Sequence, residues 1–111
     1  MKSKKLSGSF YTPKIVADFL VDYLSQKFKD TGSISILEPS AGDGIFVKTI
    51  YNHETLKKKV QKLVAVEKSK RELNKISKEV TNKSFSAIHM DFLDFQNNNP
   101  ETFSLVVGNP Q

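Results

Sequence analysis

The sequence predicts an α/β fold built on a mostly parallel, doubly wound sheet. Short apolar runs alternate with segments of helical periodicity along most of the chain. A glycine-containing loop, LEPSAGDG, directly follows the first apolar run. Polar residues follow the ends of the predicted strands, and ligands bind at the carboxyl ends of the strands in sheets of this kind.

The first predicted elements are a helix, a strand and a second helix. Thr12 and Pro13 have the residue types of an N-cap and a first helical position. The helix after them is predicted to bury a stripe formed by Ile15, Val16, Phe19, Leu20, Tyr23 and Leu24. A strand is predicted over residues 33–37, and a second helix near Ile45 should carry Phe46, Val47 and Ile50.

The rest of the chain is predicted to add three strands and one helix. Residues 63–66 form a short apolar run typical of a buried strand. A polar helix from about Lys70 should pack Leu73, Ile76 and Val80. Residues 84–89 and 103–107 are predicted as the third and fourth strands, joined by a loop.

Composition excludes several kinds of site. The 111 residues contain no cysteine, which rules out disulfides, thiolate metal sites and a cysteine nucleophile. His53 and His89 lack ligand-spaced partners, so no metal site is predicted. The net charge of +5 and the lysine clusters allow a polyanionic partner, although charge alone favours solvated helix faces.

The chain is predicted to be a single cytoplasmic domain without membrane contact. No apolar run approaches the roughly 20 residues that span a bilayer. Residues 1–9 are basic and expected to be flexible, and they lack the apolar stretch of a signal peptide.

The glycine loop predicts a ligand other than a dinucleotide. Gly42 and Gly44 allow a tight turn and a close approach of the backbone to a ligand. The third position of the dinucleotide fingerprint is Val47, and the carboxylates of Glu38 and Asp43 would repel a phosphate. S-adenosylmethionine fits better, because it offers an ammonium, a sulfonium, a ribose and an adenine.

Two further strand ends match that ligand. Glu67 lies 25 positions after Gly42 and ends the second strand, where an acid can accept hydrogen bonds from ribose hydroxyls. Asp91 can accept a proton of the adenine amine while Phe92 packs on the purine. A helix or turn cap for Asp91 and ordinary core packing for Phe92 remain the alternatives.

These residues resemble adenine-specific DNA methyltransferases of the gamma class, in the N-terminal half of the catalytic domain. The matching segments, in order, are Tyr11-Thr12-Pro13, Glu38-Pro39-Ser40-Ala41-Gly42-Asp43-Gly44, Glu67, Asp91-Phe92-Leu93 and Asn109-Pro110. The resemblance covers nearly the whole chain. It implies a Rossmann-like S-adenosylmethionine-dependent methyltransferase fold, of which this chain supplies four mostly parallel strands in the order 3-2-1-4 with flanking helices.

The resemblance also implies roles for these residues. Tyr11, Thr12 and Glu38 would face the methionine part, and the loop of Ser40, Gly42 and Gly44 would pass beneath it. Glu67 would hold the ribose, and Asp91 and Phe92 the adenine. Asn109 and Pro110 would be catalytic, accepting the two N–H bonds of a flipped adenine amine. Transfer of the methyl group to that amine in DNA would serve a restriction-modification system.

One departure and one missing part limit what this chain is expected to do alone. Gln111 stands where the family has a second proline, which precedes a stacking aromatic residue. We therefore expect a cofactor-binding part of a larger enzyme, truncated and inactive alone, that self-associates through the exposed strand at residues 103–107. The alternatives are a non-catalytic S-adenosylmethionine-binding module, a split subunit, or a methyltransferase for RNA or protein glutamine.

Overall fold

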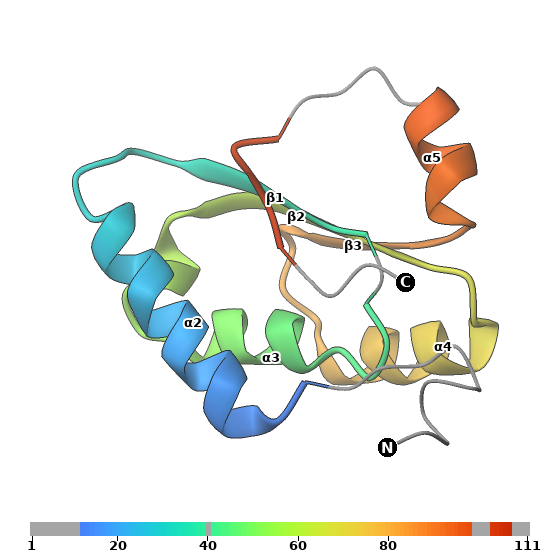
Figure 1. Ribbon diagram of the computed structural model, residues 1–111, viewed down its shortest axis with the longest axis horizontal. Coiled ribbons are helices and arrows are strands. Elements are labelled where there is room, and N and C mark those ends of the chain that lie inside the picture. The colour runs from blue at the N-terminus through green and yellow to red at the C-terminus, as the bar shows by residue number, and fades with distance from the viewer. Residues whose placement is uncertain (1–11, 40, 99–102, 108–111) are drawn as a thin grey trace.

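The computed structural model describes residues 12–39, 41–98 and 103–107, and Figure 1 shows their arrangement. Tyr11, Ser40, Asn109 and Pro110, four of the predicted site residues, lie outside these ranges. The elements in chain order are α2 (Lys14–Lys27), β1 (Ile34–Glu38), α3 (Ile45–Asn52), the 3-10 helix η1 (Leu56–Lys58), β2 (Val60–Glu67), α4 (Lys70–Glu79), β3 (Phe85–His89), α5 (Phe92–Asn98) and β4 (Leu105–Val106).

The four strands form one parallel sheet in the order β3-β2-β1-β4, as the resemblance implied. The crossovers through α3 and α4 place both helices, together with α2, on one face of the sheet, and α5 crosses the opposite face (Figure 1). Successive crossovers from β1 to β2 to β3 run in one direction, and the step to β4 returns past β1. The carboxyl ends of β1 and β4 therefore lie at the switch point of the sheet, where ligands bind.

Alternating side chains of the strands build two cores of unequal size. Ile36 of β1 and Leu63 and Ala65 of β2 are fully buried on the face covered by α2, α3 and α4. Leu37 and Val64 point to the other face, where Phe95 of α5 packs against them. This period of two confirms that β1 and β2 are buried on both faces, as their apolar sequences predict.

The predicted buried face of α2 is wrong except at Leu24. The buried residues are Ala17, Val21, Leu24 and Ser25, and the predicted stripe is largely exposed, with Ile15, Phe19 and Tyr23 at 78%, 69% and 56%. Both sets repeat with helical spacing, so periodicity alone could not choose between them. The helix face with Ala17 packs against the rest of the domain. The small side chain of Ala17 suits this close packing.

Several element boundaries also differ from prediction, and one predicted loop contains a helix. Pro13 rather than Thr12 occupies the N-cap position of α2, and no side chain caps that end. Residues 92–98 form α5 where a loop was expected. Within the predicted strand 103–107, only Leu105–Val106 pairs as a strand, and its partner is β1.

Candidate functional site

The glycine loop between β1 and α3 makes a tight turn through two left-handed residues. Gly42 and Gly44 have φ values of 56° and 78°, which residues with a Cβ seldom adopt. The N–H of Gly44 donates to the carbonyl oxygen of Ala41 at 2.8 Å and closes the turn. The predicted turn at both glycines is therefore confirmed.

Several backbone donors of this loop are bound by acceptors of the protein itself. The N–H of Gly42 donates to Oε1 of Glu67 at 2.7 Å, and the N–H of Ile45 donates to Oδ1 of Asp43 at 3.1 Å. The N–H of Ala41 donates to the carbonyl oxygen of Val66 at 3.2 Å. Asp43 was predicted only as a negative charge in the loop. Its role as a cap at the start of α3 could have been read from an Asp placed two residues before a helix.

Glu67 connects the glycine loop to the turn after β2. Its side chain is only 7% exposed, and its Oε2 accepts the N–H of Ser69 at 2.8 Å. A carboxylate offers about four lone-pair sites, and the bonds from Gly42 and Ser69 use two of them. The predicted acid at the end of β2 thus lies against the glycine loop, and it keeps the capacity to accept further hydrogen bonds.

Glu38 is the second buried acid at this edge of the sheet. It ends β1, is 2% exposed and pairs in the β1–β2 ladder with Ala65. Carboxylates are rarely buried so deeply in a small domain, and their desolvation is costly. Turn formation explains neither Glu38 nor Glu67, which lie in strands.

Asp91 and Phe92 occupy the start of α5. Oδ1 of Asp91 accepts the N–H of Leu93 at 2.9 Å, and its carbonyl oxygen accepts the N–H of Phe95 at 3.0 Å. Phe92 stacks on Phe95, with ring centroids 6.5 Å apart, and contacts the smaller core. Capping and core packing therefore describe both residues in this structure, and their contacts with an adenine remain a prediction.

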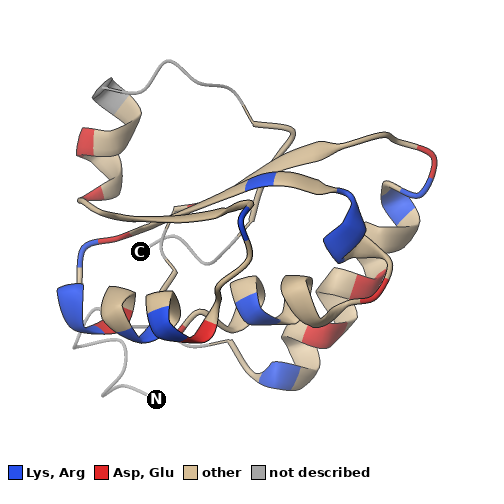
Figure 2. Ribbon diagram, turned by 180° about the vertical axis from the view of Figure 1, so that it is seen from behind, with Lys and Arg blue, Asp and Glu red and all other residues tan. Residues whose placement is uncertain are grey.

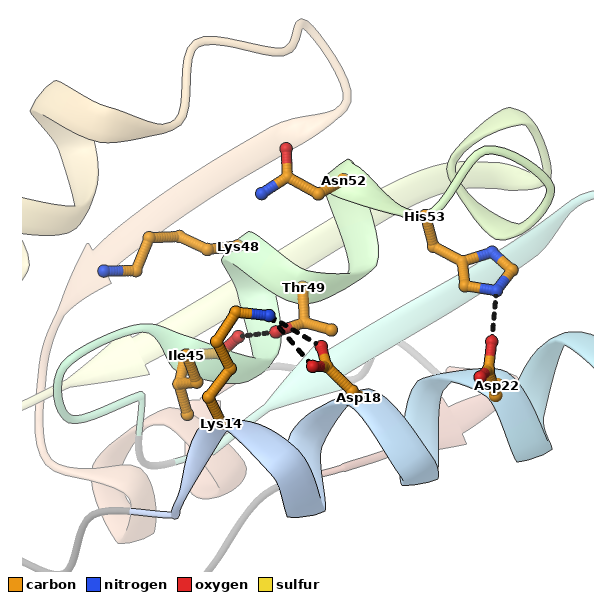
Figure 3. Close-up of a pocket in the computed structure, with 8 residues that line it drawn as sticks. All are labelled: Lys14, Asp18, Asp22, Ile45, Lys48, Thr49, Asn52 and His53. Carbon is orange, nitrogen blue, oxygen red and sulfur yellow. Dashed lines mark hydrogen bonds and ion pairs between the residues drawn. The ribbon is translucent and has the colours of Figure 1, made fainter.

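A groove lies apart from these acids, between α2 and α3 (Figure 3). Its volume is about 610 Å³, and its lining residues are Lys14, Asp18, Asp22, Ile45, Lys48, Thr49, Asn52 and His53. Nε2 of His53 lies 2.9 Å from Oδ1 of Asp22, while its Nδ1 accepts the N–H of Leu56. That acceptor role fixes the proton of a neutral ring on Nε2. The groove shows polar pairs at the surface and none of the predicted site residues.

Charge and metal-ligand chemistry add little to the site. Figure 2 shows lysine and arginine on several elements, including both ends of the helical layer. Within the described part of the chain, no group of three or more His, Asp or Glu residues could hold a metal ion. Among the same residues, no helix is long and apolar enough to cross a membrane.

The fold is shared with solved methyltransferases. A candidate class I S-adenosylmethionine-dependent methyltransferase from Listeria monocytogenes matches with a TM-score of 0.72 and 19% identity, over 88% of this chain and 31% of that chain. A candidate RNA methyltransferase from Pyrococcus horikoshii matches with a TM-score of 0.69 and 18% identity, over 93% of this chain and 48% of that chain. The methyltransferase subunit of a type I restriction-modification system from Streptococcus thermophilus matches with a TM-score of 0.69 and 19% identity. The match covers 91% of this chain and 23% of that chain. The fold is thus the Rossmann-like fold of S-adenosylmethionine-dependent methyltransferases, as predicted.

The sequence defines the family more narrowly. The profile of the N-6 DNA methylase family matches residues 1–111. The chain therefore belongs to the N-6 DNA methylase family, which confirms the predicted adenine-specific class. It spans about half or less of the three solved chains described above. No curated protein matches the sequence significantly.

Proposed function

We propose that this chain is the cofactor-binding part of a DNA adenine methyltransferase. It binds S-adenosylmethionine at the carboxyl ends of β1, β2 and β3. The complete enzyme transfers the methyl group to the exocyclic amine of adenine in DNA, within a restriction-modification system. The family supports the reaction, and the observation that carries the site is the pair of buried acids, Glu38 and Glu67, beside the glycine loop.

The chemistry of these donors and acceptors fits the cofactor. S-adenosylmethionine supplies an electrophilic methyl group on a cationic sulfonium, together with an ammonium and two ribose hydroxyls. Glu38 can balance the positive charge of the methionine part, and Glu67 can accept from the ribose with its remaining lone pairs. Asp91 and Phe92 stand at the end of β3, where an acceptor and an aromatic face would hold an adenine.

The target amine would be activated at the end of β4. An aryl amine is a weak nucleophile because its lone pair is delocalised into the ring. The side-chain oxygen of Asn109 and the carbonyl oxygen of Pro110 would accept its two N–H bonds and draw the nitrogen toward a tetrahedral, nucleophilic state. The base would first leave the duplex, and alignment for in-line attack would supply much of the rate. Tyr11, Thr12 and Ser40 would complete the walls around the methionine part.

Titration calorimetry tests the cofactor site directly. The chain is titrated with S-adenosylmethionine, with its demethylated product S-adenosylhomocysteine, and with NAD. We expect both methionine-derived nucleosides to bind more tightly than NAD. Tighter binding of NAD would contradict the proposal. A tritiated-methyl assay of the full-length enzyme on DNA, RNA and protein then separates adenine in DNA from the two alternative substrates.

A further inference from the structure

We propose that Asp43 makes this nucleoside site selective against phosphorylated ligands, by holding its own carboxylate where a phosphate would bind. The inference rests on the proposed function, because it concerns the same site. Asp43 would be a specificity-determining residue of that site. The rejected ligands would be nucleotides whose ribose carries phosphates.

A glycine loop followed by a helix is ordinarily an anion-binding structure. The free N–H groups at the helix start and the helix dipole both attract a phosphate. Here α3 begins directly after Gly44, so the same local structure is present. What differs is the acceptor, because the N–H of Ile45 is bound by Oδ1 of Asp43 at 3.1 Å.

Two other donors of the loop are occupied as well. Gly42 donates to Glu67 at 2.7 Å, and Gly44 donates to the carbonyl oxygen of Ala41 at 2.8 Å. A phosphate would therefore have to displace internal acceptors, two of which are carboxylates. Glu67 is almost fully buried, so water screens its charge poorly. The repulsion and the occupied donors act in the same direction.

A neutral ribose with a cationic substituent meets neither obstacle. Its hydroxyls donate to carboxylates, and its positive charge is attracted by them. All these ligands share an adenosine. The loop thus distinguishes S-adenosylmethionine from ATP, ADP or NAD by the charge of the group attached to the ribose.

The charge of Asp43 can be separated from its capping bond. Asparagine is nearly isosteric, caps helices about as well as aspartate, and keeps a carbonyl oxygen for the N–H of Ile45. Asp43→Asn therefore removes the charge and retains the turn. Asp43→Ser is a second neutral variant with an acceptor oxygen.

The test measures dissociation constants of adenosine, ADP and S-adenosylhomocysteine for the full chain and for each variant, at low and at physiological salt. We expect the wild-type chain to bind ADP at least tenfold more weakly than adenosine. In Asp43→Asn the ratio of the two constants should fall at least fivefold, while the constant for adenosine, which carries no charge, changes less than twofold. Glu79→Gln on α4 is the matched control, because it removes an exposed acid paired with Lys48.

The outcomes distinguish this inference from the proposed function. If S-adenosylhomocysteine and adenosine bind but the ADP ratio is the same in wild-type, Asp43→Asn and Asp43→Ser, the role of Asp43 is refuted and the cofactor site stands. Wild-type affinity for ADP equal to that for adenosine refutes it equally. If no adenosine compound binds the wild-type chain, the proposed function fails and the inference fails with it. Circular dichroism of each variant confirms that it is folded.

Discussion

A Cβ atom placed on Gly44 would lie 2.7 Å from Cγ1 of Ile76, well inside van der Waals contact. Gly44 is the N-cap residue of α3, and Ile76 is a fully buried residue of α4. The turn of the glycine loop is therefore fitted against the neighbouring helix, and the glycine is required by packing as well as by its φ of 78°.

Gly44→Ala should destabilise the fold. The left-handed conformation costs a residue with a Cβ roughly 1–2 kcal/mol, and overpacking adds about 1–3 kcal/mol. Urea unfolding should show a loss of about 2–5 kcal/mol in the free energy of unfolding. Ile76→Ala removes the Cγ1 atom, so the double variant Gly44→Ala with Ile76→Ala should lose less stability than the sum of the two single changes.

Gly32→Ala is the matched control for that experiment. Nothing lies within 4 Å of a Cβ at Gly32, and its φ is not in the left-handed region. Its free energy of unfolding should stay the same or rise slightly, because alanine restricts the unfolded chain. Equal losses in both variants would contradict the packing argument.

Cofactor binding should depend on Glu67 more than on Asp91. Asp91→Ala loses one hydrogen bond to an uncharged group, worth about 1 kcal/mol, so S-adenosylmethionine should bind up to roughly tenfold more weakly. Glu67→Ala removes two such bonds and also frees Gly42 and Ser69, so its loss should be larger. Calorimetry with Glu54→Ala, which changes an exposed acid on another side, provides the control.

The stability of the protein should fall in alkali partly because of Tyr51. Burial raises the pKa of Tyr51 above 10.0, opposed by its hydrogen bond with Ser84. Above pH 10 the unfolded chain releases this proton more readily than the folded one, so ionisation favours unfolding. The contribution is complete below pH 10 and is lost as the pH rises.

Tyr51→Phe should remove that component. Unfolding titrations between pH 8 and 11 should show a shallower alkaline loss for this variant than for the wild-type chain. Tyr23→Phe is the control, because the side chain of Tyr23 is 56% exposed. If wild-type and Tyr51→Phe lose stability in parallel, Tyr51 does not contribute.

Self-association remains a prediction, and the structure offers two surfaces for it. One is the edge at β4, where Val106 is 59% exposed and Ser104 and Val107 extend the backbone bonding to β1. The other surface is the stripe of Ile15, Phe19 and Tyr23 on α2, which is exposed although the sequence pattern predicted it to be buried. Light scattering across a dilution series should show association that Val106→Lys reduces. If Phe19→Lys reduces association and Val106→Lys does not, the contact lies on α2 instead.

The sequence predicted the sheet well because buried parallel strands are short, apolar runs that glycine and proline bound. It predicted the positions of Glu38 and Glu67 for the same reason, since a polar residue that directly ends an apolar run lies at the edge of the sheet. It could not predict the partner of Glu67. The bond to Gly42 joins residues 25 positions apart, and only the register of β1 against β2 brings them together.

Two errors have a common origin. On α2, the stripes of Ile15 and of Ala17 both repeat with helical spacing, and tertiary packing selected the second. At α5, a run of seven residues after Asp91 is too short for periodicity to identify, although the Asp cap was visible. In both cases local pattern was ambiguous, and the decision depended on contacts distant in sequence.

The unequal covering of the two sheet faces has a consequence for how the protein opens. Three helices protect one face, whereas α5, of seven residues, is the helix that covers the other in the described part of the chain. If α5 detaches from the sheet, the contacts of Phe92 and Phe95 are lost, but the larger core stays intact. Amide protons of α5, such as that of Phe95, should therefore exchange with solvent through a local opening. Amides buried in α3 and β2 should exchange only when the whole sheet comes apart.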